Sequence, residues 1–150
     1  LERSAAQGSI ERYFARYPGV ARYMEETRNA ARMNGYVETV FGRRLWLPDI
    51  RAAQAGRRQG AERAAINAPM QGTAADLIKL AMIAVQDWIS REHLHARLIL
   101  QVHDEIVLEV PEAELPRLRT ELPPLMTRVA ALRVPLAVEV GVGANWDEAH

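Results

Sequence analysis

The sequence predicts a mixed α/β (α+β) fold in which a small antiparallel sheet is backed by helices. Apolar residues recur at steps of three and four between residues 61 and 92, which is typical of one helix face. Two apolar-rich segments, residues 97–102 and 105–110, are separated by only two residues, which is the spacing of a tight β-hairpin. At 150 residues the chain fits one domain with a buried core, and it shows no internal repeat, low-complexity tract or linker.

The first 60 residues are expected to form two helices, a strand pair and a loop. Pro18 and Gly19 end the first helix, and Gly35 provides the left-handed residue that commonly ends a helix. The strand-forming segment turns at Phe41–Gly42 and ends at Pro48. In chain order, the predicted elements are a helix at 10–17, a helix at 20–34, strands within 36–47 and a loop at 51–60.

The long helix predicted for residues 61–92 contains Pro69. A proline ring clashes with the carbonyl four residues back, here that of Ala65, so a kink or restart is expected near residues 69–72. Thr73, with Asp76 three residues later, could cap the restarted helix.

The last 50 residues are predicted to add the hairpin, a further helical stretch and a third strand. The helical stretch covers residues 112–133 and is expected to break at Pro123–Pro124. The third strand is expected at residues 136–140.

Composition places the chain among ordinary soluble globular proteins, with 49% hydrophobic and 25% charged residues. No cysteine is present, which excludes disulfides and thiolate metal sites, and no apolar run approaches the roughly 20 residues of a membrane span. The first four residues lack a signal-peptide pattern, so a cytoplasmic location is expected. The net charge is zero, but the segment from Arg43 to Arg63 contains six arginines and only two acidic residues.

The predicted hairpin has His103 and Asp104 at its tip, where asparagine or glycine is usual because both central residues need positive φ. Residues less suited to the turn suggest that their side chains serve a purpose there. Asp104 and the adjacent Glu105 would place two carboxylates at a rigid edge, which suits a hard cation such as Mg²⁺. The alternative interpretation is an ordinary hairpin with a solvated polar tip.

Arg63, Asn67 and Gln71 recur at four-residue steps in a mostly apolar segment and therefore share one helix face. At about 1.5 Å per residue this stripe is roughly 12 Å long, which matches about three base pairs of duplex. Asn and Gln amides can donate to minor-groove acceptors without reading sequence. The alternative interpretation is a solvated face on a helix that packs inward on its other side.

Several long motifs occur in a recognisable order along the chain. The hairpin segment Gln101-Val102-His103-Asp104-Glu105 with the apolar run after it resembles the last catalytic motif of DNA polymerase family A. The other matching segments are residues 17–20, 35–39, 42–44, 61–76, 138–141 and 145–146. The resemblance covers nearly the whole chain and implies the C-terminal part of a polymerase domain, comprising partial palm and fingers elements.

The resemblance implies a role for each singled-out residue. Asp104 would be one of two aspartates that bind two catalytic Mg²⁺ ions, and Glu105 would support that site. His103 would contact the primer-end backbone, while Arg63, Asn67 and Gln71 would follow the minor groove of primer–template DNA. The remaining arginines between residues 43 and 58 are left without an assigned role.

Two family features are missing from the chain: the Asp-Tyr-Ser-Gln-Ile-Glu motif with the other catalytic aspartate, and the fingers helix that grips the deoxynucleoside triphosphate. Both lie upstream in family members, so the chain is expected to start after them and finish at the natural C-terminus. Pro123–Pro124 falls in a helix that is usually continuous in relatives.

The full-length protein is therefore expected to be a cytoplasmic, nucleoid-associated DNA-directed DNA polymerase. We expect the isolated chain to lack activity, to hold the Mg²⁺ ions poorly and to self-associate through exposed apolar surface. A non-catalytic duplex DNA-binding module is the alternative. A Mg²⁺-dependent phosphodiesterase is disfavoured, because nucleases need further acidic ligands or a base near the metals.

Overall fold

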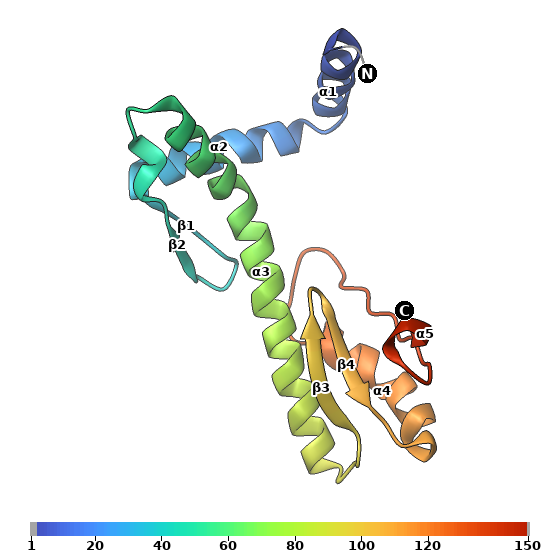
Figure 1. The fold of residues 1–150 in the computed structure, drawn as a ribbon. Coiled ribbons are helices and arrows are strands. Elements are labelled where there is room, and N and C mark those ends of the chain that lie inside the picture. The colour runs from blue at the N-terminus through green and yellow to red at the C-terminus, as the bar shows by residue number, and fades with distance from the viewer. Residues whose placement is uncertain (1–2, 150) are drawn as a thin grey trace. The chain divides into compact units, whose positions relative to one another are not determined.

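The computed structural model describes residues 3–149. It contains two compact units, one ending at Thr73 and the other beginning at Ala74. Helix α3 (Ala55–Arg91) contributes residues to both units (Figure 1). Within the described residues, no helix is long and apolar enough to cross a membrane.

The first unit begins with two helices, which confirms the predicted pair. The first helix starts earlier than predicted, and the second starts at Pro18, a residue favoured in the first turn of a helix. Gly35 has φ 81° and its N–H donates to the Ala31 carbonyl, so it ends the second helix as predicted. The helices are α1 (Arg3–Arg16) and α2 (Pro18–Asn34).

A two-stranded antiparallel hairpin follows, as predicted for residues 36–47. Strand β1 (Tyr36–Glu38) pairs with β2 (Arg44–Trp46). In the connecting turn the Gly42 N–H donates to the Thr39 carbonyl at 2.9 Å, and Gly42 itself has φ 82°. That combination of a turn followed by a left-handed residue is a common hairpin connection.

The loop predicted for residues 51–60 is wrong. The 3-10 helix η1 (Pro48–Arg51) precedes α3, which already begins at Ala55. Gly56 and Gly60 favour a loop, but glycine costs only about 1 kcal/mol in a helix, and packing offsets such a cost. The packing is an alanine face, Ala61, Ala64, Ala65 and Ala68, set against Ala31, Val37, Leu47 and Ile50.

Helix α3 also continues through Pro69, so the predicted restart is wrong. Thr73 does not cap a new helix. Instead its hydroxyl donates to the Pro69 carbonyl at 2.6 Å and accepts a hydrogen bond from the Val40 N–H at 3.0 Å. The β1–β2 turn is therefore bonded to α3 about one helical turn after Pro69, the residue that lacks an N–H for the helix.

The second unit contains the predicted hairpin. Strands β3 (Arg97–Val102) and β4 (Glu105–Glu109) are antiparallel, with Val102 opposite Glu105 at the tip. The register shifts between Leu98 and Leu100. The core of this unit joins α3, the hairpin and α4 (Leu115–Thr127), and its buried residues are Val85, Trp88, Ile89, Ala96, Leu118 and Leu122.

The remaining C-terminal predictions are wrong in two places. The short 3-10 helix η2 (Glu112–Glu114) leads into α4, which continues through Pro123 and Pro124 to Thr127. Leu118 and Leu122 are buried on this helix, and that packing holds the helical geometry in spite of the prolines. Residues 136–140 form no strand, because neither two-stranded sheet in residues 3–149 pairs with them. The last element of the described residues is α5 (Trp146–Ala149).

The predicted fold class is confirmed as a mixture of helices and small antiparallel sheets. Two separate hairpins provide the strands, one in each unit.

Candidate functional site

The tip of the β3–β4 hairpin has the unusual backbone that its residues suggested. His103 has φ 52°, in the left-handed region. Asp104 is not among the non-glycine residues with positive φ in residues 3–149, so the expectation that both tip residues need positive φ is wrong for Asp104. The side-chain amide of Gln101 donates to the His103 carbonyl and helps hold this turn.

Asp104 and His103 are exposed at the tip, while Glu105 is half-buried. Within residues 3–149 the Asp104 carboxylate makes no hydrogen bond or ion pair, although 19 cationic Lys and Arg side chains are present in the chain. An exposed carboxylate without a protein partner is available to bind a cation. Oxygen donors of this kind are the ligands preferred by Mg²⁺.

The carboxylates do not form a complete metal site by themselves. In the described part of the chain, no group of three or more His, Cys, Asp or Glu residues could hold a metal ion. The donor chemistry of Asp104 and Glu105 fits part of a magnesium shell, and the remaining ligands would come from other groups and water.

The polar stripe of Arg63, Asn67 and Gln71 lies on α3 within the first unit. All three side chains are exposed, whereas Ala65 beside them is fully buried in the alanine face. None of the three makes a hydrogen bond or ion pair within residues 3–149. The stripe therefore leaves a cation and two amides exposed on one helix face.

The other arginines between residues 43 and 58 are bonded to the protein itself. Two of them form ion pairs, Arg44 with Glu38 and Arg57 with Asp49, each at 2.7 Å. Arg44 also lies over the Tyr36 ring, and its bond to Glu38 raises its pKa further. Three others donate to backbone carbonyls: Arg43 to Gly72, Arg51 to Arg32 and Met33, and Arg58 to Ala52 and Ala53.

Sequence reasoning did not identify the contact between the β1–β2 turn and α3. Arg43 donates to the Gly72 carbonyl at 2.9 Å, and Val40 donates to Thr73, so both residues after Gln71 are bonded to the turn. The one sequence signal was Gly72 itself. A Cβ at that position would lie 2.7 Å from Cγ2 of Thr39, so only glycine allows the approach.

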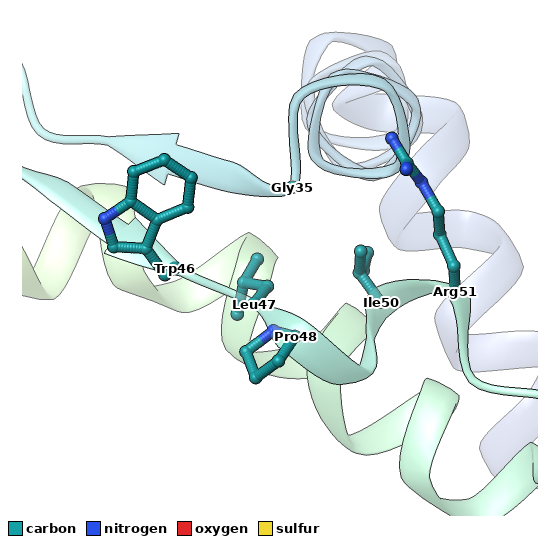
Figure 2. A pocket seen from close by; sticks show the side chains of 6 residues that line it. All are labelled: Gly35, Trp46, Leu47, Pro48, Ile50 and Arg51. Carbon is teal, nitrogen blue, oxygen red and sulfur yellow. The ribbon is translucent and has the colours of Figure 1, made fainter.

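An open pocket of about 350 Å³ lies elsewhere in the first unit (Figure 2). Its lining is mostly apolar and includes Trp46, Leu47 and Ile50. Arg51 extends toward the end of α2, where it bonds to the Arg32 and Met33 carbonyls. The pocket contains no carboxylate and none of the predicted site residues, so the chemistry of the hairpin tip lies outside it.

Comparisons with known proteins agree over the whole chain. The family model described as DNA polymerase family A matches residues 1–148. DNA polymerase I of Pseudomonas aeruginosa is 59% identical over 150 residues, covering 100% of this chain and 16% of that protein. The thermostable DNA polymerase I of Thermus aquaticus is 48% identical over 141 residues, covering 94% of this chain and 17% of its own length.

A solved structure also matches closely. It is described as the POL domain of Pol1 from M. smegmatis in complex with DNA primer-template and dNTP. The TM-score is 0.94 at 44% sequence identity, covering 97% of this chain and 26% of that one. The chain thus spans about a sixth of the length of the curated relatives that it matches, which is 16–17% for the two relatives above.

Proposed function

This chain belongs to DNA polymerase family A, and from that premise we propose that it is the C-terminal part of a DNA-directed DNA polymerase. The complete enzyme adds deoxynucleotides to the 3′ end of a primer, in the cytoplasm and at the nucleoid. The observation that carries the proposal is the exposed Asp104 carboxylate, without a protein partner in residues 3–149, at the tip of the β3–β4 hairpin.

We assign metal binding to the hairpin tip. Asp104 would hold Mg²⁺ together with a second aspartate from a part of the enzyme outside these 150 residues, and Glu105 would support the site from beside it. Two Mg²⁺ ions, when bound, supply Lewis-acid stabilisation of the charge that develops in phosphoryl transfer. His103 contacts the backbone of the primer end.

The α3 stripe is proposed to bind the minor groove of primer–template DNA. Asn67 and Gln71 donate amide hydrogen bonds to acceptors that every base pair presents, so binding does not depend on sequence. Arg63 adds a positive charge beside the phosphates. Arg63 makes no hydrogen bond or ion pair within residues 3–149, which supports this role. The arginines of residues 43–58, in contrast, are bonded to the protein's own groups.

The decisive experiment is Asp104→Ala in the full-length enzyme, with Asp87→Ala as the matched control. Asp87 is an exposed aspartate of α3 without a hydrogen bond or ion pair in residues 3–149. We expect Asp104→Ala to lower nucleotide incorporation on the order of 10³-fold, in the range of losses seen when a group stabilising transition-state charge is removed. Primer–template affinity should stay within a few fold, and near-normal turnover would refute the metal role.

The isolated chain is proposed to be inactive, since it offers one of the two required aspartates and no triphosphate-gripping helix. Primer extension with Mg²⁺ and all four triphosphates tests this, and robust templated synthesis would show that nothing essential is missing.

Duplex DNA binding without catalysis is the second candidate function for the chain by itself. The stripe is complete within the first unit, whereas the carboxylate pair is not a complete metal site. Binding of a primer–template duplex by the isolated chain, lost in Asn67→Ala/Gln71→Ala, would support this function.

A further inference from the structure

The β1–β2 turn and α3 are joined by a small network of hydrogen bonds in the first unit. Arg43 donates from Nη2 to the Gly72 carbonyl at 2.9 Å, and the Val40 N–H donates to Oγ1 of Thr73 at 3.0 Å. The Thr73 hydroxyl then donates to the Pro69 carbonyl at 2.6 Å. We call these bonds, together with the contact of Thr39 at Gly72, the turn clamp.

The turn clamp lies within about one helical turn of Pro69 in α3. Pro69 has no N–H, so the helix lacks one of its regular hydrogen bonds there, and proline is the least favourable residue in a helix interior. The helix nevertheless continues without interruption from Ala55 to Arg91. The bonds from Val40 and Arg43 provide the outside support that a proline-containing helix needs to keep its geometry.

The clamp also surrounds one residue of the polar stripe. Gln71 lies between Pro69 and Gly72–Thr73, so the residues before and after it are fixed by the clamp, while its own side chain is exposed. A displacement of the helix at this point would move the Gln71 amide away from its acceptor. Displacements on the order of 1 Å in a positioned group can change rates by about 10²-fold.

We propose that the turn clamp positions Gln71 for DNA binding, with Arg43 and Thr73 as positioning residues that do not touch the DNA. This inference rests on the proposed function, since it requires Gln71 to contact primer–template DNA. It gives the β1–β2 hairpin a role in substrate binding and explains why Arg43 donates to a helix carbonyl when its neighbour Arg44 pairs across the hairpin with Glu38.

The test uses the full-length polymerase that contains this chain. Arg43→Ala removes the bond to Gly72, and Thr73→Val removes the hydroxyl while keeping the shape of the side chain. Arg44→Ala is the matched control for the first change, because Arg44 makes its bond within the hairpin. Thr73→Ser is the control for the second, because serine keeps the hydroxyl.

The readouts are the KM for primer–template, the kcat, and thermal unfolding to establish that each variant is folded. We expect Arg43→Ala and Thr73→Val to raise the KM for primer–template about three- to tenfold, and Gln71→Ala about tenfold, which is the effect of losing one hydrogen bond. Arg44→Ala and Thr73→Ser should match the wild type. The double variant Arg43→Ala/Gln71→Ala should be no worse than Gln71→Ala, because both changes remove the same contact.

Three outcomes would overturn the inference. Arg43→Ala could behave like Arg44→Ala, Thr73→Val like Thr73→Ser, or the double variant could show the product of the two single losses. If Gln71→Ala is impaired and Arg43→Ala is not, only the positioning role is lost and the minor-groove role stands. If Gln71→Ala itself binds DNA like the wild type, both roles are lost.

Discussion

Gly72→Ala tests how closely the β1–β2 turn approaches α3. Alanine is the better helix former by about 1 kcal/mol, so helix propensity alone predicts that this substitution stabilises the helix. The structure predicts the opposite. A Cβ at Gly72 would lie 2.7 Å from Cγ2 of Thr39 and 3.3 Å from Nη2 of Arg43.

The expected cost follows from what would have to move. Thr39 is buried, and its Oγ1 accepts a hydrogen bond from the Arg43 N–H at 3.2 Å, so its methyl group cannot swing away without breaking that bond. Overpacking of this kind costs about 1–3 kcal/mol. After the helix-propensity gain is subtracted, we expect a net local destabilisation of up to about 2 kcal/mol.

Native-state hydrogen exchange of the peptide covering residues 66–76 measures the local loss of stability in Gly72→Ala. A loss of about 2 kcal/mol, the upper end of this range, would make these amides exchange about 30 times faster. Thr39→Ser supplies the matched background, because serine keeps the hydroxyl and lacks Cγ2; there Gly72→Ala should be neutral or stabilising. Slower exchange in Gly72→Ala, with the same effect in both backgrounds, would refute the close approach.

Three further predictions concern the second unit and the isolated chain. Leu118→Ala should lower the free energy of unfolding by about 2–5 kcal/mol in urea titrations, because Leu118 is buried in the core. Its control is Arg119→Ala at the exposed neighbouring position, which should change the free energy of unfolding by less than about 0.5 kcal/mol. Hydrogen bonds from the His95 N–H, the His95 side chain and the Ala96 N–H hold the pKa of Glu114 below its ordinary 4.5. A lowered carboxyl pKa contributes stability that is present above about pH 4.5 and lost as the pH falls through the folded-state value. Glu114→Gln should therefore be less stable at neutral pH and show a flatter decline below pH 4.5 in unfolding midpoints measured against pH; a decline as steep as in the wild type would contradict this. We also propose that the isolated chain self-associates through strand β3, where Ile99 is 58% exposed and Leu100 is 45% exposed. Sedimentation should show oligomers that Ile99→Lys shifts toward monomer, and a wild-type monomer at all concentrations would contradict the proposal.

The elements that sequence predicted correctly are those whose signals are local. Gly35 adopts the left-handed conformation predicted for the residue that ends a helix, and the turn predicted at Phe41–Gly42 forms. The two-residue spacing at His103–Asp104 produces the β3–β4 hairpin. Each of these signals acts over a few residues, so the sequence alone carries it.

The errors arise where packing between distant segments overrides a local preference. Pro69, Pro123 and Pro124 all lie inside helices that continue past them. In α3 the helix just after Pro69 is held by hydrogen bonds from the β1–β2 turn, about 30 residues earlier in the chain, to Gly72 and Thr73. The segment 136–140 has strand-forming residues and still forms no strand, because a strand also needs a partner.

The arginines of the first unit also differ in whether a local pattern or a distant contact determines their role. Arg63 could be assigned to the exposed stripe because its partners in the pattern, Asn67 and Gln71, lie at fixed helical steps. Nothing in the local sequence distinguishes Arg43 from Arg44, although one donates to Gly72 of α3 and the other pairs with Glu38 across the hairpin. A count of positive charge treats them alike. The bonding partners of Arg43 and Arg44 lie at different distances along the chain. Only the folded structure therefore shows that substituting Arg43 should affect α3 and that substituting Arg44 should not.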